Sequence, residues 1–220
     1  MDLLKGWLPH LEALRAHILR VVLVWVAAGC AIFAVKEQAL ALALRPLQTA
    51  MPHVNILATG ITDLFAAYIK LSLWGGLLLT MPYLLWELWR FLKPALYPSE
   101  RRWIGSLLLA VPGLTGLGML FGWWVMLPPM LGFFLGFNAE GVVAMPRLGD
   151  YLNLLVSTLG LLGLAFNFPL VLVGLVKMGL VHTATLAAQR RVVIVAMFVI
   201  AAVATPTPDP LSMTLLAVPL

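Results

Sequence analysis

Residues 151–176 read YLNLLVSTLGLLGLAFNFPLVLVGLV, and no charged side chain interrupts this run. A helix needs about 20 apolar residues, at about 1.5 Å each, to cross roughly 30 Å of hydrocarbon. The run is therefore long enough to cross a bilayer as a helix. It predicts that the chain is an all-α integral membrane protein.

The composition of the whole chain supports this prediction. Of its 220 residues, 62% are hydrophobic and 10% are charged, whereas a soluble domain carries about 25% charged residues. So few charges cannot solvate a surface in water, so lipid must be the solvent for most of it. The net charge of +5 would suggest nucleic acid on a soluble protein. On a membrane protein it indicates basic loops on one side, and we expect no nucleic-acid partner.

Five further apolar segments bring the predicted number of transmembrane helices to six, in a single transmembrane domain over residues 1–220. The five segments cover about residues 18–36, 65–90, 103–127, 192–204 and 211–220. The fifth span would be only about 20 Å long, so it must thin the bilayer or lie behind other helices. The alternative is a re-entrant hairpin formed by the last two segments. The sixth is still apolar at Leu220, which predicts that it continues further.

The distribution of Lys and Arg predicts that both termini are cytoplasmic. This orientation places ten basic residues inside: Lys5, Arg15, Arg20, Arg90, Lys93, Arg101, Arg102, Lys177, Arg190 and Arg191. It leaves four outside: Lys36, Arg45, Lys70 and Arg147. The excess agrees with the positive-inside rule. The long outer connections, residues 37–62 and 128–149, are expected to form short helices.

Prolines and glycines inside the spans predict how the helices bend and pack. Pro82, Pro112 and Pro169 each remove a backbone hydrogen bond and bend a helix, which predicts a curved bundle with a concave face. Prolines are also common in membrane helices without further consequence. Gly118 and Gly122, like Gly132 and Gly136, have the spacing of a close helix contact.

Few polar residues lie at membrane depth or beside the helix ends, and these are the candidates for function. Asn167 lies inside the fourth span, where its amide needs a partner on a neighbouring or a guest helix. Glu87 lies three residues before Arg90, which favours a local ion pair. Glu12 and Glu100 either converge on a cationic ligand or are solvated loop charges of little energetic weight.

Motifs of soluble enzymes are absent from the sequence. It contains no Walker loop, GxSxG, HExxH or dinucleotide fingerprint. The four histidines are scattered, and the single Cys30 allows neither an internal disulfide nor a cysteine metal site. We therefore predict a protein that is not an enzyme, without metal or cofactor.

Four segments, taken together, resemble the TatC family, the largest membrane subunit of the twin-arginine protein translocase. Residues 10–15, HLEALR, resemble the family's N-terminal HLxELR signature, and residues 91–102, FLKPALYPSERR, resemble its first cytoplasmic loop, FxxPALYxxERR. Residues 163–169, GLAFNFP, are similar to its GxxFExP segment, and residues 205–210, TPTPDP, to the turn between its last two spans.

The resemblance implies a function in protein transport. TatC proteins bind twin-arginine signal peptides of folded precursors at the cytoplasmic face and assemble with single-span TatA and TatB subunits. Transport is driven by the proton-motive force. The resemblance thus implies a location in the bacterial inner membrane, precursor proteins as partners, and self-association in a receptor complex.

The family's functional positions map onto one end of the predicted bundle. Glu100 matches the signal-binding glutamate of the first cytoplasmic loop, and a carboxylate suits the bidentate fork of an arginine. Around it, the resemblance assigns signal binding to Glu12, Arg15, Phe91, Leu96, Arg101 and Arg102. It assigns contact with a partner helix in the membrane to Asn167 and Pro169.

Two positions depart from the family pattern. The glutamate of HLxELR is Ala13 here, and Glu12 stands one residue earlier, which on a helix rotates the carboxylate by about 100°. The family's glutamate in span four is Asn167, which keeps hydrogen bonding but cannot titrate. These departures leave open a divergent paralogue with impaired signal recognition. A secondary transporter of small solutes is the other alternative, although the matching halves typical of that class are not visible.

Overall fold

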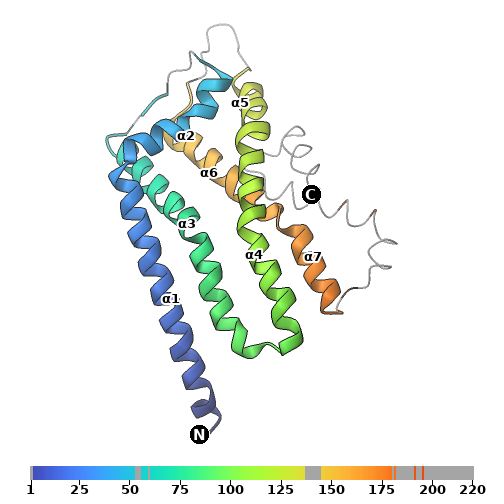
Figure 1. Cartoon of the computed structure of the whole chain (residues 1–220). Helices are drawn as coiled ribbons and strands as arrows, with labels where there is room; N and C mark the ends of the chain where they lie inside the picture. Colours follow the sequence, from blue (N-terminus) through green and yellow to red (C-terminus); the bar gives the residue numbers. More distant parts are fainter. Residues whose placement is uncertain are drawn as a thin grey trace. The chain divides into compact units, whose positions relative to one another are not determined.

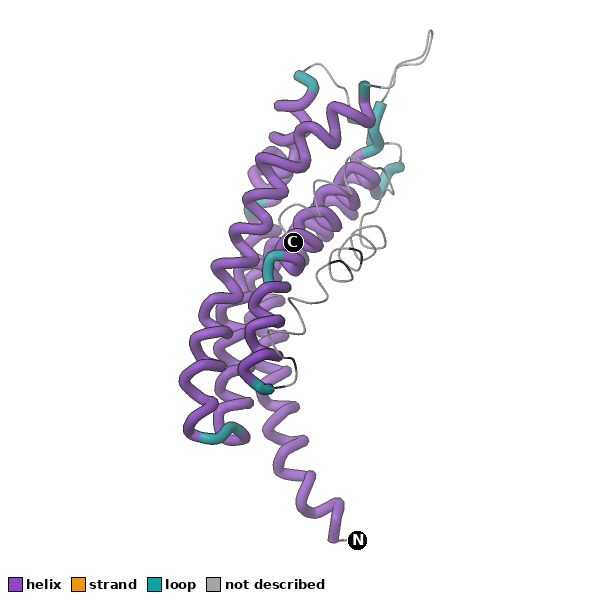
Figure 2. Tube along the Cα trace, turned by 90° about the vertical axis from the view of Figure 1, so that its right-hand side faces the viewer, coloured by secondary structure: helices purple, strands orange, loops and turns teal. Residues whose placement is uncertain are grey.

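The computed structural model describes residues 2–52, 56–58, 60–136, 145–179, 181, 191 and 195. Within these ranges the chain forms helices joined by short connections (Figure 2). The predicted fifth and sixth spans, residues 192–204 and 211–220, and the turn at residues 205–210 fall outside the described residues, apart from Val195.

Four helical runs are long and apolar enough to cross a membrane: Leu14–Ala34, Asp63–Leu92, Glu100–Leu135 and Leu148–Lys177. Long apolar helices therefore cover the four segments predicted as spans at about residues 18–36, 65–90, 103–127 and 151–176. The elements in chain order are α1 (Asp2–Ala34), α2 (Lys36–Ala50), α3 (Asp63–Leu92), η1 (Lys93–Ala95), α4 (Pro98–Phe121), η2 (Gly122–Met126), α5 (Leu127–Leu135), α6 (Leu148–Ala165) and α7 (Phe168–Lys177) (Figure 1).

The third helical run continues past residue 127, where the predicted span ends, to Leu135. Pro128 and Pro129 lack the N–H groups that a regular helix would use there. The turn before them, η2, is a π-helix, and the Leu127 N–H bonds the Gly122 carbonyl five residues back. The widened turn and the place of both prolines in the first turn of α5 let the helix continue.

The fourth span is interrupted, whereas the sequence predicts one helix. The interruption separates α6 from α7 at residues 166–167. Pro169 cannot donate a hydrogen bond and lies in the first turn of α7. The Asn167 N–H instead bonds the Leu164 carbonyl at 3.0 Å, as in a tight turn. The break therefore follows from Pro169, and it places Asn167 at the start of a new helix.

The chain divides into two compact units, which are described separately. Unit 1 comprises Met1–Leu40 and Phe65–Pro112, and unit 2 comprises Ala41–Leu64 and Gly113–Leu220. Unit 1 thus holds α1, nearly all of α3 and the first part of α4. Unit 2 holds most of α2, the second part of α4, and α5 to α7.

In unit 1, α1 and α3 lie side by side and meet where both have glycine (Figure 1). A Cβ added at Gly76 would lie 2.8 Å from the Gly29 nitrogen and 2.9 Å from its Cα. A Cβ added at Gly29 would meet the Ser72 carbonyl oxygen at an ordinary 3.4 Å, so the close approach of the two backbones requires glycine at position 76. Four residues before Gly29, the Trp25 indole N–H donates to the Leu73 carbonyl at 2.9 Å and joins the same two helices.

Gly76→Ala is expected to destabilise the protein by about 1–3 kcal/mol, because the clash is with backbone that cannot rotate away. Gly75→Ala is the matched control. Its Cβ would meet the Ile32 side chain at 3.5 Å, an ordinary contact, and alanine is the better helix former. Thermal unfolding in detergent measures both variants, and equal midpoints for the two would contradict the close crossing.

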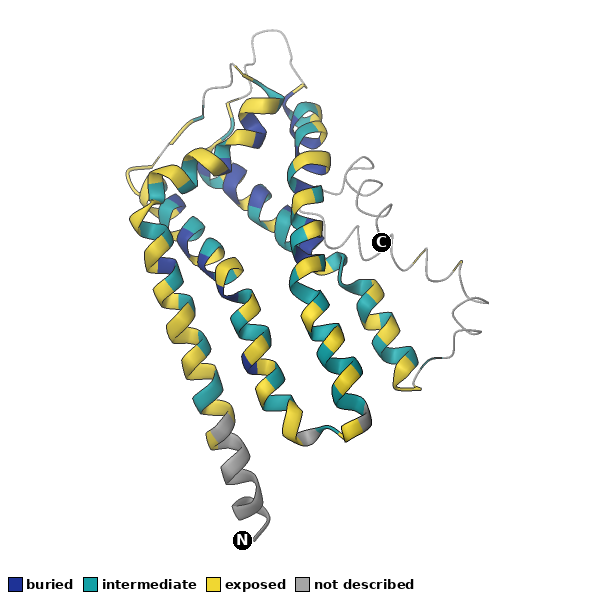
Figure 3. Cartoon of the chain, in the orientation of Figure 1, coloured by how far each residue is buried: buried dark blue, intermediate teal, exposed yellow. Residues whose placement is uncertain are grey.

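In unit 2, α4 and α6 cross at a second glycine contact. A Cβ at Gly118 would collide with the Leu162 carbonyl, and one at Gly122 would lie 2.7 Å from the Leu162 side chain. The predicted packing role of Gly118 and Gly122 is confirmed. Among the described residues, a Cβ added at Gly132 would meet nothing within 4 Å, and one at Gly136 would meet only backbone of its own helix, so the second pair makes no such contact. The buried core beside this crossing is formed by Met126, Met130 and Leu162. In Figure 3 the buried residues of this unit gather on the facing sides of its helices.

The two connections predicted to lie outside, residues 37–62 and 128–149, meet within unit 2. The Leu57 N–H donates to the Pro146 carbonyl at 3.1 Å, and the Leu148 N–H donates to the Leu57 carbonyl at 3.0 Å. The Tyr151 hydroxyl donates to the Ala43 carbonyl at 2.6 Å and ties α6 to α2. The short helices predicted for residues 37–62 and 128–149 are present as α2 and, in part, α5.

Candidate functional site

The predicted site residues of unit 1 gather at one end of it. The N-terminal part of α1 carries Glu12 and Arg15, and the connection from α3 to α4 carries Phe91, Leu96 and Glu100. Figures 1 and 2 show that this part of α1 and this connection lie at the same end of the unit. The fold therefore brings together two segments that are about 80 residues apart in sequence.

Glu100 has a structural role at the start of α4. Tyr97 precedes the helix, Pro98 is its first residue, and the Glu100 carboxylate accepts the Tyr97 N–H at 3.2 Å. This is the return half of a capping box, in which the third residue of a helix satisfies the N–H of its N-cap. Proline suits the first position because an N–H group there would have no acceptor within the helix, so nothing is lost by its absence. The second carboxylate oxygen of Glu100 has no such task and remains able to accept a ligand.

The neighbours of Glu100 differ in exposure. Leu96 and Arg101 are half-buried, and the Arg101 Nε–H donates to the Leu96 carbonyl at 3.2 Å, which fixes the corner of the connection. Arg102 is exposed. Phe91 lies edge-on against the His17 ring, with 5.8 Å between ring centroids. This contact connects the loop end of α3 to α1.

Glu12 and Arg15 are both exposed on α1. Among the described side chains, no hydrogen bond or ion pair joins either of them to Glu100. The structure thus places Glu12 at the same end of the unit as the α3–α4 connection, but not in contact with the Glu100 carboxylate. That the two glutamates share one ligand remains a prediction.

At this end, α1 and α3 are held together by a cluster of polar side chains around Glu87, which is only 2% exposed. Glu87 and His17 share a hydrogen bond, and the Tyr83 hydroxyl donates to Glu87 at 3.0 Å. Arg20 and Arg90 approach the same carboxylate at 3.4 and 3.3 Å. A buried carboxylate needs such partners, since removing it from water is costly.

The sequence predicts the local part of this cluster but not the part across the helices. The pairing of Glu87 with Arg90 is confirmed, as both lie on α3. His17 and Arg20 were not predicted as partners. They lie one turn apart on α1 and so share a face of the helix. This spacing is the sequence feature that indicates a common partner. Which element that face meets depends on the pairing of α1 with α3.

Asn167 is the centre of a polar contact in unit 2. Its Nδ2 donates to the Thr115 hydroxyl at 2.8 Å and to the Gly163 carbonyl at 2.7 Å. The predicted partner on a neighbouring helix is therefore Thr115 of α4. The Asn167 Oδ1 atom is buried and accepts no hydrogen bond from the residues that the structure describes. Pro169 lies two residues further, in the first turn of α7.

Comparison with known proteins establishes the family. The sequence model of the family described as Sec-independent protein translocase protein (TatC) matches residues 9–219. The chain belongs to the TatC family. The resemblance found in the sequence motifs is thereby confirmed over nearly the whole chain.

Relatives and solved structures agree with this assignment. The TatC protein of Deinococcus radiodurans is 35% identical over 216 residues, which is 96% of this chain and 80% of that protein. The TatC protein of Azotobacter chroococcum is 37% identical over 212 residues, 96% of this chain and 83% of its own length. A crystal structure of the twin-arginine translocase receptor TatC superposes with a TM-score of 0.76 at 31% identity, covering 96% of this chain and 92% of that chain.

Membership of the TatC family makes the chain a membrane component of a protein translocase rather than an enzyme. It also implies that the chain works within a protein complex. Among the described residues, no group of three or more His, Cys, Asp or Glu is arranged to hold a metal ion. The described site residues offer carboxylates, guanidiniums and an amide for recognition.

Proposed function

We propose that this chain is the receptor subunit of a twin-arginine translocase, which binds twin-arginine signal peptides at the cytoplasmic face of the bacterial inner membrane. In this proposal a single domain of six spans places both termini in the cytoplasm, as the ten-to-four excess of basic residues indicates. The end of unit 1 that carries Glu12 and Glu100 then faces the cytoplasm.

The observation that carries the proposal is the placement of Glu100. Its carboxylate begins α4 at the end of unit 1 where α1 also presents Glu12, and its capping bond occupies only one oxygen. A guanidinium binds a carboxylate through charge-assisted hydrogen bonds, roughly twice as strong as neutral ones. Phe91 and Leu96 add apolar surface beside it for the residues that flank the two arginines.

The proposal includes TatA- and TatB-type single-span partners and self-association in the receptor complex. Asn167 and Pro169 are the proposed contact with a partner helix. The free acceptor on Asn167 Oδ1 supports this, since a buried carbonyl without a donor is costly and a donor on an incoming helix would satisfy it. Because the amide does not titrate, the proton-motive force acts in this proposal at other groups.

Complementation tests the proposal. The chain is expressed together with its own TatA- and TatB-type partners in a bacterium that lacks TatC, and export of a twin-arginine reporter is followed by its periplasmic activity. We expect export that stops when the two arginines of the reporter are changed to lysine. Stable expression with no export, or export independent of the arginines, would contradict receptor function.

The alternative of a divergent paralogue with impaired signal recognition rests on Ala13 and Asn167. If the departures abolish recognition, complementation fails for the chain itself but is restored by Ala13→Glu or Asn167→Glu. A small-solute transporter would instead take up solute when the purified chain alone is placed in liposomes. The three functions therefore give different results in these two assays.

A further inference from the structure

Two arginines that contact Glu87 carry an excess of positive charge at one end of the α1–α3 pair. Arg20 and Arg90 both reach its carboxylate, yet 46% and 53% of their side chains remain exposed. One carboxylate against two guanidiniums leaves the cluster positive. Such a cluster attracts an anion.

Both arginines stand near the ends of apolar runs. Arg20 lies in the second turn of the run Leu14–Ala34, and Arg90 lies two residues before the end of Asp63–Leu92. Long basic side chains at such positions extend toward the membrane surface. This is the depth at which lipid phosphates lie, and basic residues between helices bind anionic head groups there.

An apolar groove between α1 and α3 begins beside this cluster. Its first part has a volume of about 250 Å³, and its lining includes Ile18 and Val22 of α1, Leu84 and Phe91 of α3, and His17 and Glu87 of the cluster.

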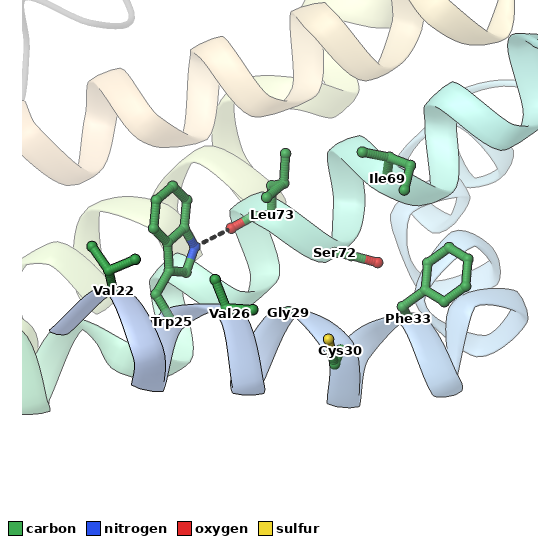
Figure 4. Close-up of a pocket in the computed structure, with 9 residues that line it drawn as sticks. All are labelled: Val22, Trp25, Val26, Gly29, Cys30, Phe33, Ile69, Ser72 and Leu73. Carbon is green, nitrogen blue, oxygen red and sulfur yellow. Dashed lines mark hydrogen bonds between the residues drawn. The ribbon is translucent and has the colours of Figure 1, made fainter. Parts of the chain in front are cut away.

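A second groove of about 400 Å³ adjoins the first at Val22, which lines both. Figure 4 shows it bounded by Val26, Cys30 and Phe33 on α1 and by Ile69 and Leu73 on α3, with Trp25 reaching across. From Arg20 to Phe33, α1 covers about 20 Å, at least the depth of one leaflet, which is about 15 Å of hydrocarbon. The two grooves together match an acyl chain that hangs from a head group at the arginines.

We propose that this side of the α1–α3 pair binds one anionic phospholipid, with its phosphate against Arg20 and Arg90 and an acyl chain along the two grooves. The guanidiniums would donate charge-assisted hydrogen bonds to the phosphate, beyond those they already give Glu87. The charge at the groove end favours this occupant over an apolar partner helix. Phe91, which belongs to the proposed signal site, also lines the first groove, so the lipid site adjoins the signal site.

The test compares lipids on the purified full-length chain by native mass spectrometry. We expect phosphatidylglycerol to bind at least about fivefold more tightly than phosphatidylcholine with the same acyl chains, a difference that is readily resolved. Arg20→Gln and Arg90→Gln should each reduce this preference to less than about twofold. Arg147→Gln removes an exposed arginine of unit 2 and should leave the preference unchanged. Equal binding of both lipids to the unchanged protein would overturn the proposal.

A second variant keeps the charged cluster intact. Val22→Phe fills the junction of the two grooves and should weaken both lipids, whereas Leu23→Phe, at a residue that is 68% exposed and lines neither groove, should not. Inorganic phosphate should fail to displace the lipid, and full displacement would reduce the site to an anion site. A photo-crosslinker at Val26 should label lipid in native membranes. Labelling of a protein there would assign the groove to a partner helix and overturn the proposal.

Discussion

Glu100→Gln is expected to weaken binding of a twin-arginine precursor by about tenfold or more, the loss of one charge-assisted pair. Glutamine is the informative replacement because its amide oxygen can still accept the Tyr97 N–H and keep the start of α4. The variant therefore separates recognition from capping. Affinity is measured with a fluorescent signal peptide on the purified receptor complex.

Two further variants serve as controls for this result. Glu100→Ala removes the cap as well as the charge, and should lose binding together with some thermal stability. Glu37→Gln makes the same change of charge on an exposed residue in the first turn of α2 and should leave affinity unchanged. Full affinity in Glu100→Gln would show that Glu100 only caps the helix.

Glu87→Leu is expected to lower the midpoint of thermal unfolding by about 5 °C or more. The replacement fits the buried volume, but it leaves His17, Arg20 and Arg90 without the carboxylate that holds them. Breaking a buried ion pair on one side is costly because the remaining charges lose their partner. The measurement is thermal unfolding of the purified chain in detergent.

Tyr83→Phe gives the graded comparison for Glu87. It removes one hydrogen bond to the carboxylate at 3.0 Å and leaves every charge in place. We expect a shift of the midpoint clearly smaller than that of Glu87→Leu. If Glu87→Leu unfolds at the temperature of the unchanged chain, the cluster does not hold α1 against α3.

The sequence predicts the existence of the first four spans because hydrophobic length is a local property. The structure differs from the simple pattern where helices end and where they are interrupted. The third helical run continues to Leu135 because a π-helical turn accommodates Pro128 and Pro129. Hydropathy alone does not predict such a turn. The fourth span breaks at Asn167 because a proline in this place ends one helix and begins another. A single proline is compatible with a bend or with a break, and the packing around it decides.

The candidate site shows the same division between local and long-range information. The loop motif predicts Glu100 and its neighbours because they are contiguous. The partners of Glu87 across α1 could not be predicted, since they depend on the approach of Gly29 to Gly76 and hence on which helices pair. Likewise, the sequence predicts that Asn167 needs a partner, but only the packing of α4 against α6 identifies Thr115.

The central claim is that the α3–α4 connection recognises the two arginines of a signal peptide. A photo-crosslinker at Tyr97 tests it most directly, because this side chain is 73% exposed and its backbone N–H remains to bind Glu100. We expect an adduct with a twin-arginine precursor that is lost when both arginines become lysine and when Glu100 becomes glutamine. An adduct of equal yield with the twin-lysine precursor, or no adduct in a complex that exports its precursor, would show that the α3–α4 connection does not recognise the two arginines.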